Sequence, residues 1–340
     1  MFSKEVNDFR AHYGFLIFAY MVNFPIFLWV LNQQLLDLPM LKISLVILQG
    51  QVAFFFFLFF YFMLKRAING NNPLDIVDWL CQWDHIKPIL FRTMILVSLM
   101  VMVIFFQLNS KLLFNQFLLW DGVWDRLLQD FDIWVFGAHP WQIVTSLLSE
   151  QSTVRFIRFL DLVYIYWFSI QWLAIYDAAF LAPSELRNKT LMNYIIIWFI
   201  GTETGGFIYS GGPFFYALDP HNLSQANFLH QIHEVTPLFC YKAQLLLWDN
   251  FLVGGTNIRL GISAFPSLHV AISYFIFLYC LDRQKFRVIS FIFFLVIWVG
   301  SSVLGWHYMA DGFGAIILVH VARFITNCIF NINQKMSVVK

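Results

Sequence analysis

The chain has 340 residues, of which 60% are hydrophobic, 20% aromatic and only 12% charged, and its net charge is +1. An average soluble domain carries about twice this share of charged residues, so the composition excludes an ordinary soluble protein. The small net charge gives no reason to expect a nucleic-acid partner. The apolar runs are continuous rather than alternating, which favours helices over a barrel, the other structure that satisfies the backbone in lipid.

We count eight stretches that are long and apolar enough to cross a membrane, for which about 20 residues are needed. They are residues 13–35, 43–64, 90–108, 157–181, 191–209, 264–281, 287–305 and 308–329. We therefore predict an all-α, multi-pass membrane bundle with a core of six spans. Its expected parts are 1–66 with two spans, 67–110 with a polar cytoplasmic linker and the third span, 111–330 with the core, and a cytoplasmic tail at 331–340.

Lysine and arginine predict the orientation, because cytoplasmic loops carry an excess of them. With the N-terminus in the cytoplasm, cytoplasmic segments hold 14 of the 21 basic residues and the opposite side holds 7. We therefore expect both termini in the cytoplasm, and the starts of spans 264–281 and 308–329 on the outer face. The inner membrane of a bacterium is the expected location, and the sequence makes no prediction of an oligomeric state.

Two long segments, 111–154 and 211–263, would cap the outer face. Between positions 117 and 134, apolar residues recur at helical spacing with polar residues between them. This pattern predicts an amphipathic helix in the membrane interface, where its tryptophans suit the level of the headgroups.

His307 and Asp311 begin the last span and are four residues apart, so they share one face of a helix. A carboxylate beside an imidazole fixes its tautomer and stabilises its charged form, which suits a basic or nucleophilic histidine. An interfacial histidine followed by an aspartate at a helix N-terminus explains the same spacing equally well.

The segment FPSLH places Pro266 and Ser267 just before His269. Proline is favoured in the first turn of a helix, where free N–H groups attract an anion such as phosphate. A histidine in that turn can act as a general acid. A capped helix with an incidental histidine is the alternative. Because the hairpin 264–305 returns the chain to the same face, we expect this histidine, His307 and Asp311 to form one site.

The two motifs resemble those of the type-2 phosphatidic acid phosphatase superfamily, over roughly residues 120–325. The Pro-Ser-x-His motif of that family matches Pro266, Ser267 and His269, and its His-x-x-x-Asp motif matches His307 and Asp311.

Within the superfamily, the inositol phosphorylceramide synthase (inositolphosphotransferase) branch looks closest. That branch has leucine before the first histidine, as Leu268 here, and a Pro-aromatic-Tyr element, which Pro213, Phe215 and Tyr216 resemble. DIWVFGAHPWQ at 132–142 is similar to an upstream segment of the same branch, although more weakly.

The resemblance implies a covalent mechanism that needs no metal and no cofactor. His307 would attack phosphorus, Asp311 would orient it, and His269 would protonate the leaving alkoxide. Water or a lipid hydroxyl would then take the phosphoryl group. Residues 111–330 would form the catalytic core, and membrane lipids would be the substrates.

The chain also departs from the family. The phosphatase branch has an arginine six residues before the nucleophile, where this chain has Ser301, and its Lys…Arg-Pro motif is absent. Other groups must therefore bind the phosphate. The candidates for substrate or phosphate binding are Ser267, Arg259, Lys242, Arg155, Arg158, Pro213 and Tyr216.

These residues predict a lipid phosphotransferase, which moves a phosphoryl group or a phosphorylated headgroup to a lipid alcohol. A phosphatase of phosphatidic acid or polyprenyl pyrophosphate-type substrates is the first alternative, because water and a hydroxyl differ little as acceptors. A non-enzymatic lipid transporter is a more distant alternative, since the glycine-rich stretch 201–206 is typical of a helix that is interrupted near a binding site.

Overall fold

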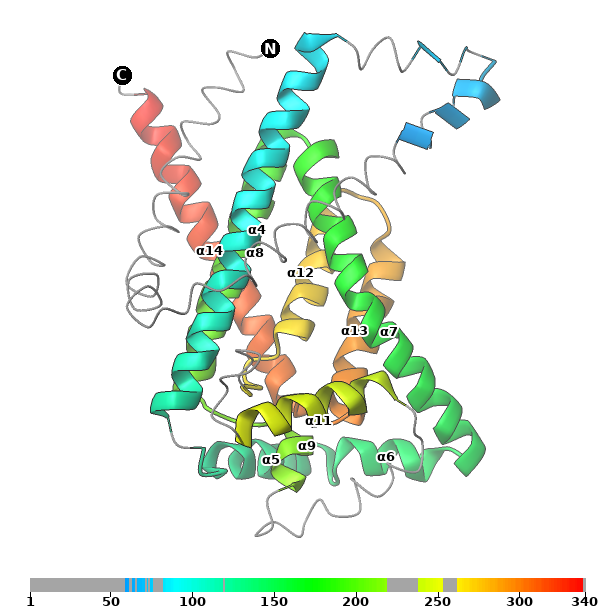
Figure 1. Ribbon diagram of the computed structural model, residues 1–340, viewed down its shortest axis with the longest axis vertical. Coiled ribbons are helices and arrows are strands. Elements are labelled where there is room, and N and C mark those ends of the chain that lie inside the picture. Colours follow the sequence, from blue (N-terminus) through cyan, green and yellow to red (C-terminus); the bar gives the residue numbers. More distant parts are fainter. Residues whose placement is uncertain are drawn as a thin grey trace. The chain divides into compact units, whose positions relative to one another are not determined.

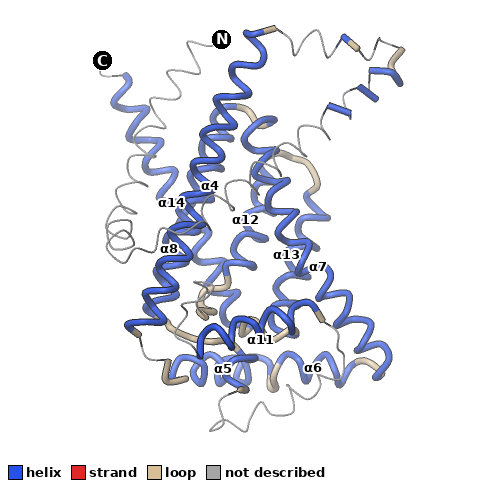
Figure 2. Tube along the Cα trace, viewed as in Figure 1, coloured by secondary structure: helices blue, strands red, loops and turns tan. Residues whose placement is uncertain are grey.

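The computed structural model describes residues 59–60, 63–64, 66–70, 72, 74–75, 82–118, 120–218, 238–252 and 262–338. In this part of the chain every regular element is a helix, and no strand occurs (Figures 1 and 2). The expected span 13–35 lies outside the described residues, as does most of 43–64.

The helices follow one another closely along the chain. They are α4 (Trp83–Phe117), α5 (Val123–Phe136), α6 (Pro140–Leu147), α7 (Glu150–Tyr176), the π-helical turn η1 (Asp177–Leu181), α8 (Ser184–Phe207), α9 (Pro213–Ala217), α11 (Phe239–Leu252), α12 (Leu268–Asp282), α13 (Arg287–Val303) and α14 (Met309–Val338). The chain forms two compact units, Met1–Phe106 with Leu173–Leu191 and Gln107–Trp172 with Met192–Lys340.

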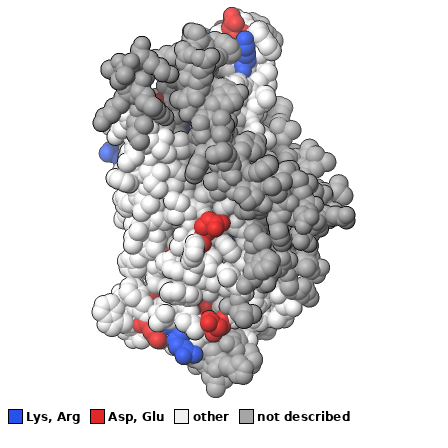
Figure 3. All heavy atoms as spheres, turned by 90° about the vertical axis from the view of Figure 1, so that its left-hand side faces the viewer, with Lys and Arg blue, Asp and Glu red and all other residues white. Residues whose placement is uncertain are grey.

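Three stretches of the described chain are long and apolar enough to cross a membrane, namely Trp83–Leu108, Glu150–Leu181 and Met309–Asn331. Helices α12 and α13 are also apolar, with 15 and 17 residues. Most described atoms on the face in Figure 3 belong to residues without charge. The prediction of a helical membrane protein is therefore confirmed.

The first unit holds α4 as far as Phe106, the end of α7 from Leu173, the turn η1 and α8 as far as Leu191. Within it, Lys189 and Glu185 form an i,i+4 ion pair of 2.7 Å in the first turns of α8. None of the residues predicted to take part in the reaction belongs to this unit.

The second unit is organised around α12, α13 and α14, which pack against one another. A short turn at 283–286 joins α12 to α13, so the N-terminal ends of α12 and α14 lie at the same end of the hairpin (Figure 1). Helices α5, α6 and α11 run across this end, with α5 packed on α14 and α6 on α13. The two histidine motifs thus lie at the end of the hairpin that these helices cover.

Helix α5 differs from the prediction in its start, and its polar face is the buried one. Helix α4 continues to Phe117, and the amphipathic helix begins only after Gly122, whose φ of 70° is left-handed. Its polar residues Asp125, Gln129 and Asp132 are buried. Its exposed apolar residues include Trp124, Leu127, Phe131 and Trp134. The apolar face therefore remains available to the membrane interface, as the prediction requires, because the polar face packs inward.

The glycine-rich stretch 201–206 lies within α8 and does not interrupt it. A Cβ atom at Gly205 would lie 2.3 Å from Oγ of Ser263 and 3.0 Å from the carbonyl oxygen of Phe265. Glycine at this position allows α8 to approach the segment that precedes α12. The feature that favoured a transporter is explained by this close packing.

Candidate active site

His307 and Asp311 lie where the chain enters α14, and both are buried. Nδ1 of His307 is 3.2 Å from Oδ2 of Asp311, which also accepts a 3.1 Å hydrogen bond from the N–H of Tyr308. Nε2 is therefore the ring nitrogen that does not face Asp311. Burial, followed by the charge of Lys111, lowers the pKa of His307 to about 3, although a hydrogen bond with the backbone of Ala264 opposes the shift. A neutral imidazole at pH 7 is the form that a nucleophile needs.

His269 lies in the first turn of α12 and is surrounded by aromatic rings. It stacks on Tyr164 with 4.5 Å between ring centroids and lies 4.4 Å from the ring of Trp167. The indole N–H of Trp167 donates a 3.0 Å hydrogen bond to the backbone oxygen of His269. The centroids of the His269 and His307 rings are 5.8 Å apart, so the structure brings both histidines to one place.

Ser267 is fully buried and stabilises the start of α12. Its Oγ accepts a 3.3 Å hydrogen bond from the N–H of Val270, as an N-cap does. Its own N–H donates to the backbone oxygen of Asp311 at 3.3 Å. Ser267 therefore connects the first turns of α12 and α14, and it does not line the cavity described next.

A cavity of about 550 Å³ lies beside the two histidines. Most of its walls are apolar or aromatic. The polar side chains that line it include Gln107, Lys111, Tyr164 and Ser263, besides His269 and His307. A volume of this size and an apolar wall with few polar groups are typical of a site for a small molecule or part of a lipid.

The family model described as the PAP2 superfamily matches residues 126–325, which is more than half of the chain. The chain belongs to the PAP2 superfamily. Members of this superfamily are phosphatases and phosphotransferases that act on phosphoesters, so the protein is an enzyme of this kind. The comparison with curated proteins found no match, and neither did the comparison with solved structures.

The described residues of this PAP2 protein include no cluster of three or more His, Cys, Asp or Glu side chains that could hold a metal ion.

Asp125 of α5 connects two of the segments that surround the PAP2 site. Its carboxylate accepts hydrogen bonds of 2.8–3.0 Å from the N–H groups of Gly211 and Gly212, and one of 2.7 Å from the indole of Trp120. The hydroxyl of Tyr308, next to His307, donates to it at 3.2 Å. Burial raises the pKa of Asp125, and these hydrogen bonds lower it in opposition.

Asp132 lies two turns further along α5 and binds the start of α14. It accepts hydrogen bonds of 2.8 Å from the backbone N–H groups of Met309 and Ala310. Burial raises the pKa of Asp132 to about 7, against the effect of these two hydrogen bonds. Sequence reasoning missed both carboxylates of α5, although Asp125, Gln129 and Asp132 at i, i+4 and i+7 form a polar stripe along one face of the helix.

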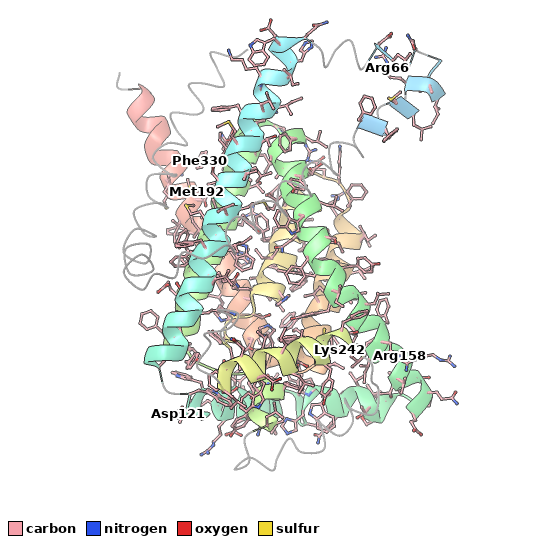
Figure 4. All side chains as sticks on the ribbon, viewed as in Figure 1. Arg66, Asp121, Arg158, Met192, Lys242 and Phe330 are labelled. Atoms are coloured by element: carbon pink, nitrogen blue, oxygen red, sulfur yellow. The ribbon has the colours of Figure 1, made fainter. Side chains whose placement is uncertain are left out.

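The basic residues named as phosphate partners lie away from the cavity where the structure describes them. Arg155 and Arg158 on α7 and Lys242 on α11 are exposed, and none of them lines it. Figure 4 labels Arg158 and Lys242. Arg259 lies outside the described residues.

The Pro-aromatic-Tyr element forms the buried helix α9. Phe215 lines the cavity, whereas Pro213 and Tyr216 do not. Gly212, with φ of 92°, precedes this helix, and a Cβ atom there would lie 2.4 Å from the carbonyl oxygen of Trp306. Glycine therefore allows the start of α9 to pack against the loop that carries His307.

Proposed function

We propose that the protein is a membrane lipid phosphotransferase, which moves a phosphoryl group or a phosphorylated headgroup to a lipid alcohol. The observation that carries the proposal is the arrangement of His269 and His307. Both line one cavity with their ring centroids 5.8 Å apart, and Asp311 engages Nδ1 of His307. Membership of the PAP2 superfamily supports chemistry on lipid-type phosphoesters.

In the proposed first step, Nε2 of His307 attacks phosphorus. A P–N bond forms as the P–O bond to the leaving group breaks, and His269 gives its proton to the leaving oxygen. Asp311 holds His307 in the tautomer with the proton on Nδ1 and stabilises the positive charge that develops on the ring.

In the second step, the acceptor hydroxyl approaches the phosphohistidine and gives its proton to His269. A P–O bond to the acceptor forms as the P–N bond breaks, which restores His307. The apolar wall of the cavity supports a lipid alcohol as the acceptor, because such a wall favours hydrocarbon over water. Hydrolysis, in which water takes this place, is the competing outcome.

The experiment uses the full-length protein in detergent with a phosphate-labelled phospholipid donor and a long-chain lipid alcohol. We expect a new labelled lipid, inhibition by vanadate, and loss of turnover in His307→Ala. His320→Ala is the matched control, because His320 on α14 forms a hydrogen bond with the hydroxyl of Tyr274 and does not line the cavity. Release of free phosphate without a new lipid would reject the transferase. Turnover that survives in His307→Ala would reject the covalent mechanism.

The orientation of the chain is part of the proposal. The starts of α12 and α14 would face the outer side, and the turn 283–286 between α12 and α13 would face the cytoplasm. A single cysteine placed in this turn should react with a membrane-impermeant thiol reagent only after the cells are opened. Labelling in intact cells would show that the turn faces the outer side and that the proposed orientation is wrong.

A further inference from the structure

The cavity contains one cation and no acid among the described residues that line it. Lys111 of α4 is the cation, and no Asp or Glu side chain belongs to the wall. No hydrogen bond or ion pair joins Lys111 to any other described residue. The described part of the wall therefore presents a positive charge to the two histidines and includes no carboxylate to neutralise it.

An ammonium group in a largely apolar cavity, with no partner among the described residues, is unfavourable because burial removes its hydration. Burial lowers the pKa of Lys111 from 10.5 to about 8, so Lys111 is still charged in most molecules at pH 7. An anionic ligand would compensate this charge. The chemistry of the wall thus indicates an anion between Lys111 and the histidines.

A second polar group of the wall also lacks a partner. Tyr164 is 4% exposed and lines the cavity, and its hydroxyl has no hydrogen-bond partner among the described residues. Its ring stacks on His269. A buried hydroxyl without a partner is unfavourable, so a ligand that accepts a hydrogen bond here would remove a penalty.

We propose that Lys111 and the Tyr164 hydroxyl bind the phosphate group of the substrate, with Lys111 as its counter-charge. The proposal rests on the proposed function, since it names the groups that hold the phosphate while His307 attacks. Lys111 lies outside the residues 126–325 that match the family model. Ser301, at the position where the phosphatase branch has an arginine, is fully buried and donates to the carbonyl oxygen of Trp298 at 2.8 Å. In this proposal the positive charge that binds the phosphate comes from Lys111 on α4 and not from position 301 on α13.

The experiment measures the affinity of the full-length protein for orthovanadate and for inorganic phosphate at pH 7. We expect Lys111→Met to weaken both affinities roughly 10- to 100-fold, because a hydrogen bond to a charged group contributes that much. Lys111→Arg keeps the charge, so its affinity for both anions should fall much less. Tyr164→Phe should weaken both affinities about 2- to 10-fold, as expected for the loss of one neutral hydrogen-bond donor. Lys87→Met, on the same helix but not among the residues that line the cavity, should match the affinity of the wild type.

Each outcome separates this inference from the proposed function. If the wild type binds vanadate and Lys111→Met binds it equally well, the assignment of Lys111 is wrong while the proposed function stands. If the wild type binds neither anion, the proposed function fails as well. Lys111→Gln provides a second test if Lys111→Met does not fold, and unchanged affinity in either folded variant overturns the inference.

Discussion

Oδ1 of Asp132 accepts a 2.8 Å hydrogen bond from the backbone N–H of Ala310, one residue before Asp311. Oδ2 accepts another from Met309 at the same distance. A carboxylate at a helix N-terminus satisfies free N–H groups and interacts favourably with the helix dipole. Here the carboxylate belongs to another helix, so the position of α5 and the start of α14 depend on each other.

We expect Asp132→Ala to destabilise the protein by about 1–3 kcal/mol, because it leaves buried N–H groups of α14 without an acceptor. Turnover should fall as well, since His307 and Asp311 flank these groups. Asp130→Ala, at an exposed position of the same helix, should change stability by less than about 0.5 kcal/mol. Denaturant unfolding in detergent checks the prediction. Equal effects of the two substitutions would show that the hydrogen bonds to α14 contribute nothing.

Gly212→Ala should destabilise the protein by roughly 3 kcal/mol or more, because its backbone conformation is open essentially to glycine alone. The added Cβ would also collide with the carbonyl oxygen of Trp306. Gly137→Ala is the control, because Gly137 also has a positive φ but open space around it, and about 1–2 kcal/mol is expected there. In thermal unfolding, the Tm of Gly212→Ala should lie well below the Tm of Gly137→Ala. The reverse order would contradict the close contact between Gly212 and Trp306.

The sequence was informative where the chemistry and the packing are local. Spacing alone paired His307 with Asp311, and the expected spans 264–281 and 287–305 lie close to α12 and α13. Apolar runs report burial in lipid directly, and a motif within five residues needs no tertiary structure to be recognised.

The remaining parts of the site depend on contacts between distant residues. Asp132 and Met309 are 177 positions apart, and no pattern in either segment names the other. Lys111 comes at the end of an apolar stretch, where a lysine usually serves as an interfacial anchor. Its relation to His269 is visible only because both residues line the same cavity. The prediction of Arg155 and Lys242 as phosphate partners rests on their side of the membrane alone, and both are exposed and do not line the cavity.

Asp311→Asn should lower kcat by on the order of 10²- to 10⁴-fold with little change in KM. An amide keeps the size of the side chain and can still accept from the N–H of Tyr308, but it no longer stabilises a charged His307. Single-turnover rates with the labelled phospholipid check this, with unfolding measured in parallel. A variant with normal kcat would remove Asp311 from the mechanism, whereas loss of folding together with kcat would assign it to stability.

The pH dependence of kcat/KM should reveal Lys111, because this ratio reports groups of the free enzyme. Lysine is charged below its pKa, so phosphate binding should be complete below about pH 8 and decline as the pH rises through that value. His269, His307, Tyr164 and Cys240 are the other titratable groups of the cavity wall. Burial lowers the pKa of His307 to about 3 and raises the pKa of Cys240, so neither produces this decline.

Lys111→Arg distinguishes the lysine from these neighbours, because arginine stays charged throughout this range. We expect the decline in kcat/KM above pH 8 to disappear or move to higher pH in Lys111→Arg, even if its absolute rate is lower. Comparison at each pH with the same substrate cancels any titration of the phosphate itself. An unchanged profile would mean that the alkaline decline belongs to another group, and that the charge of Lys111 does not act on the substrate.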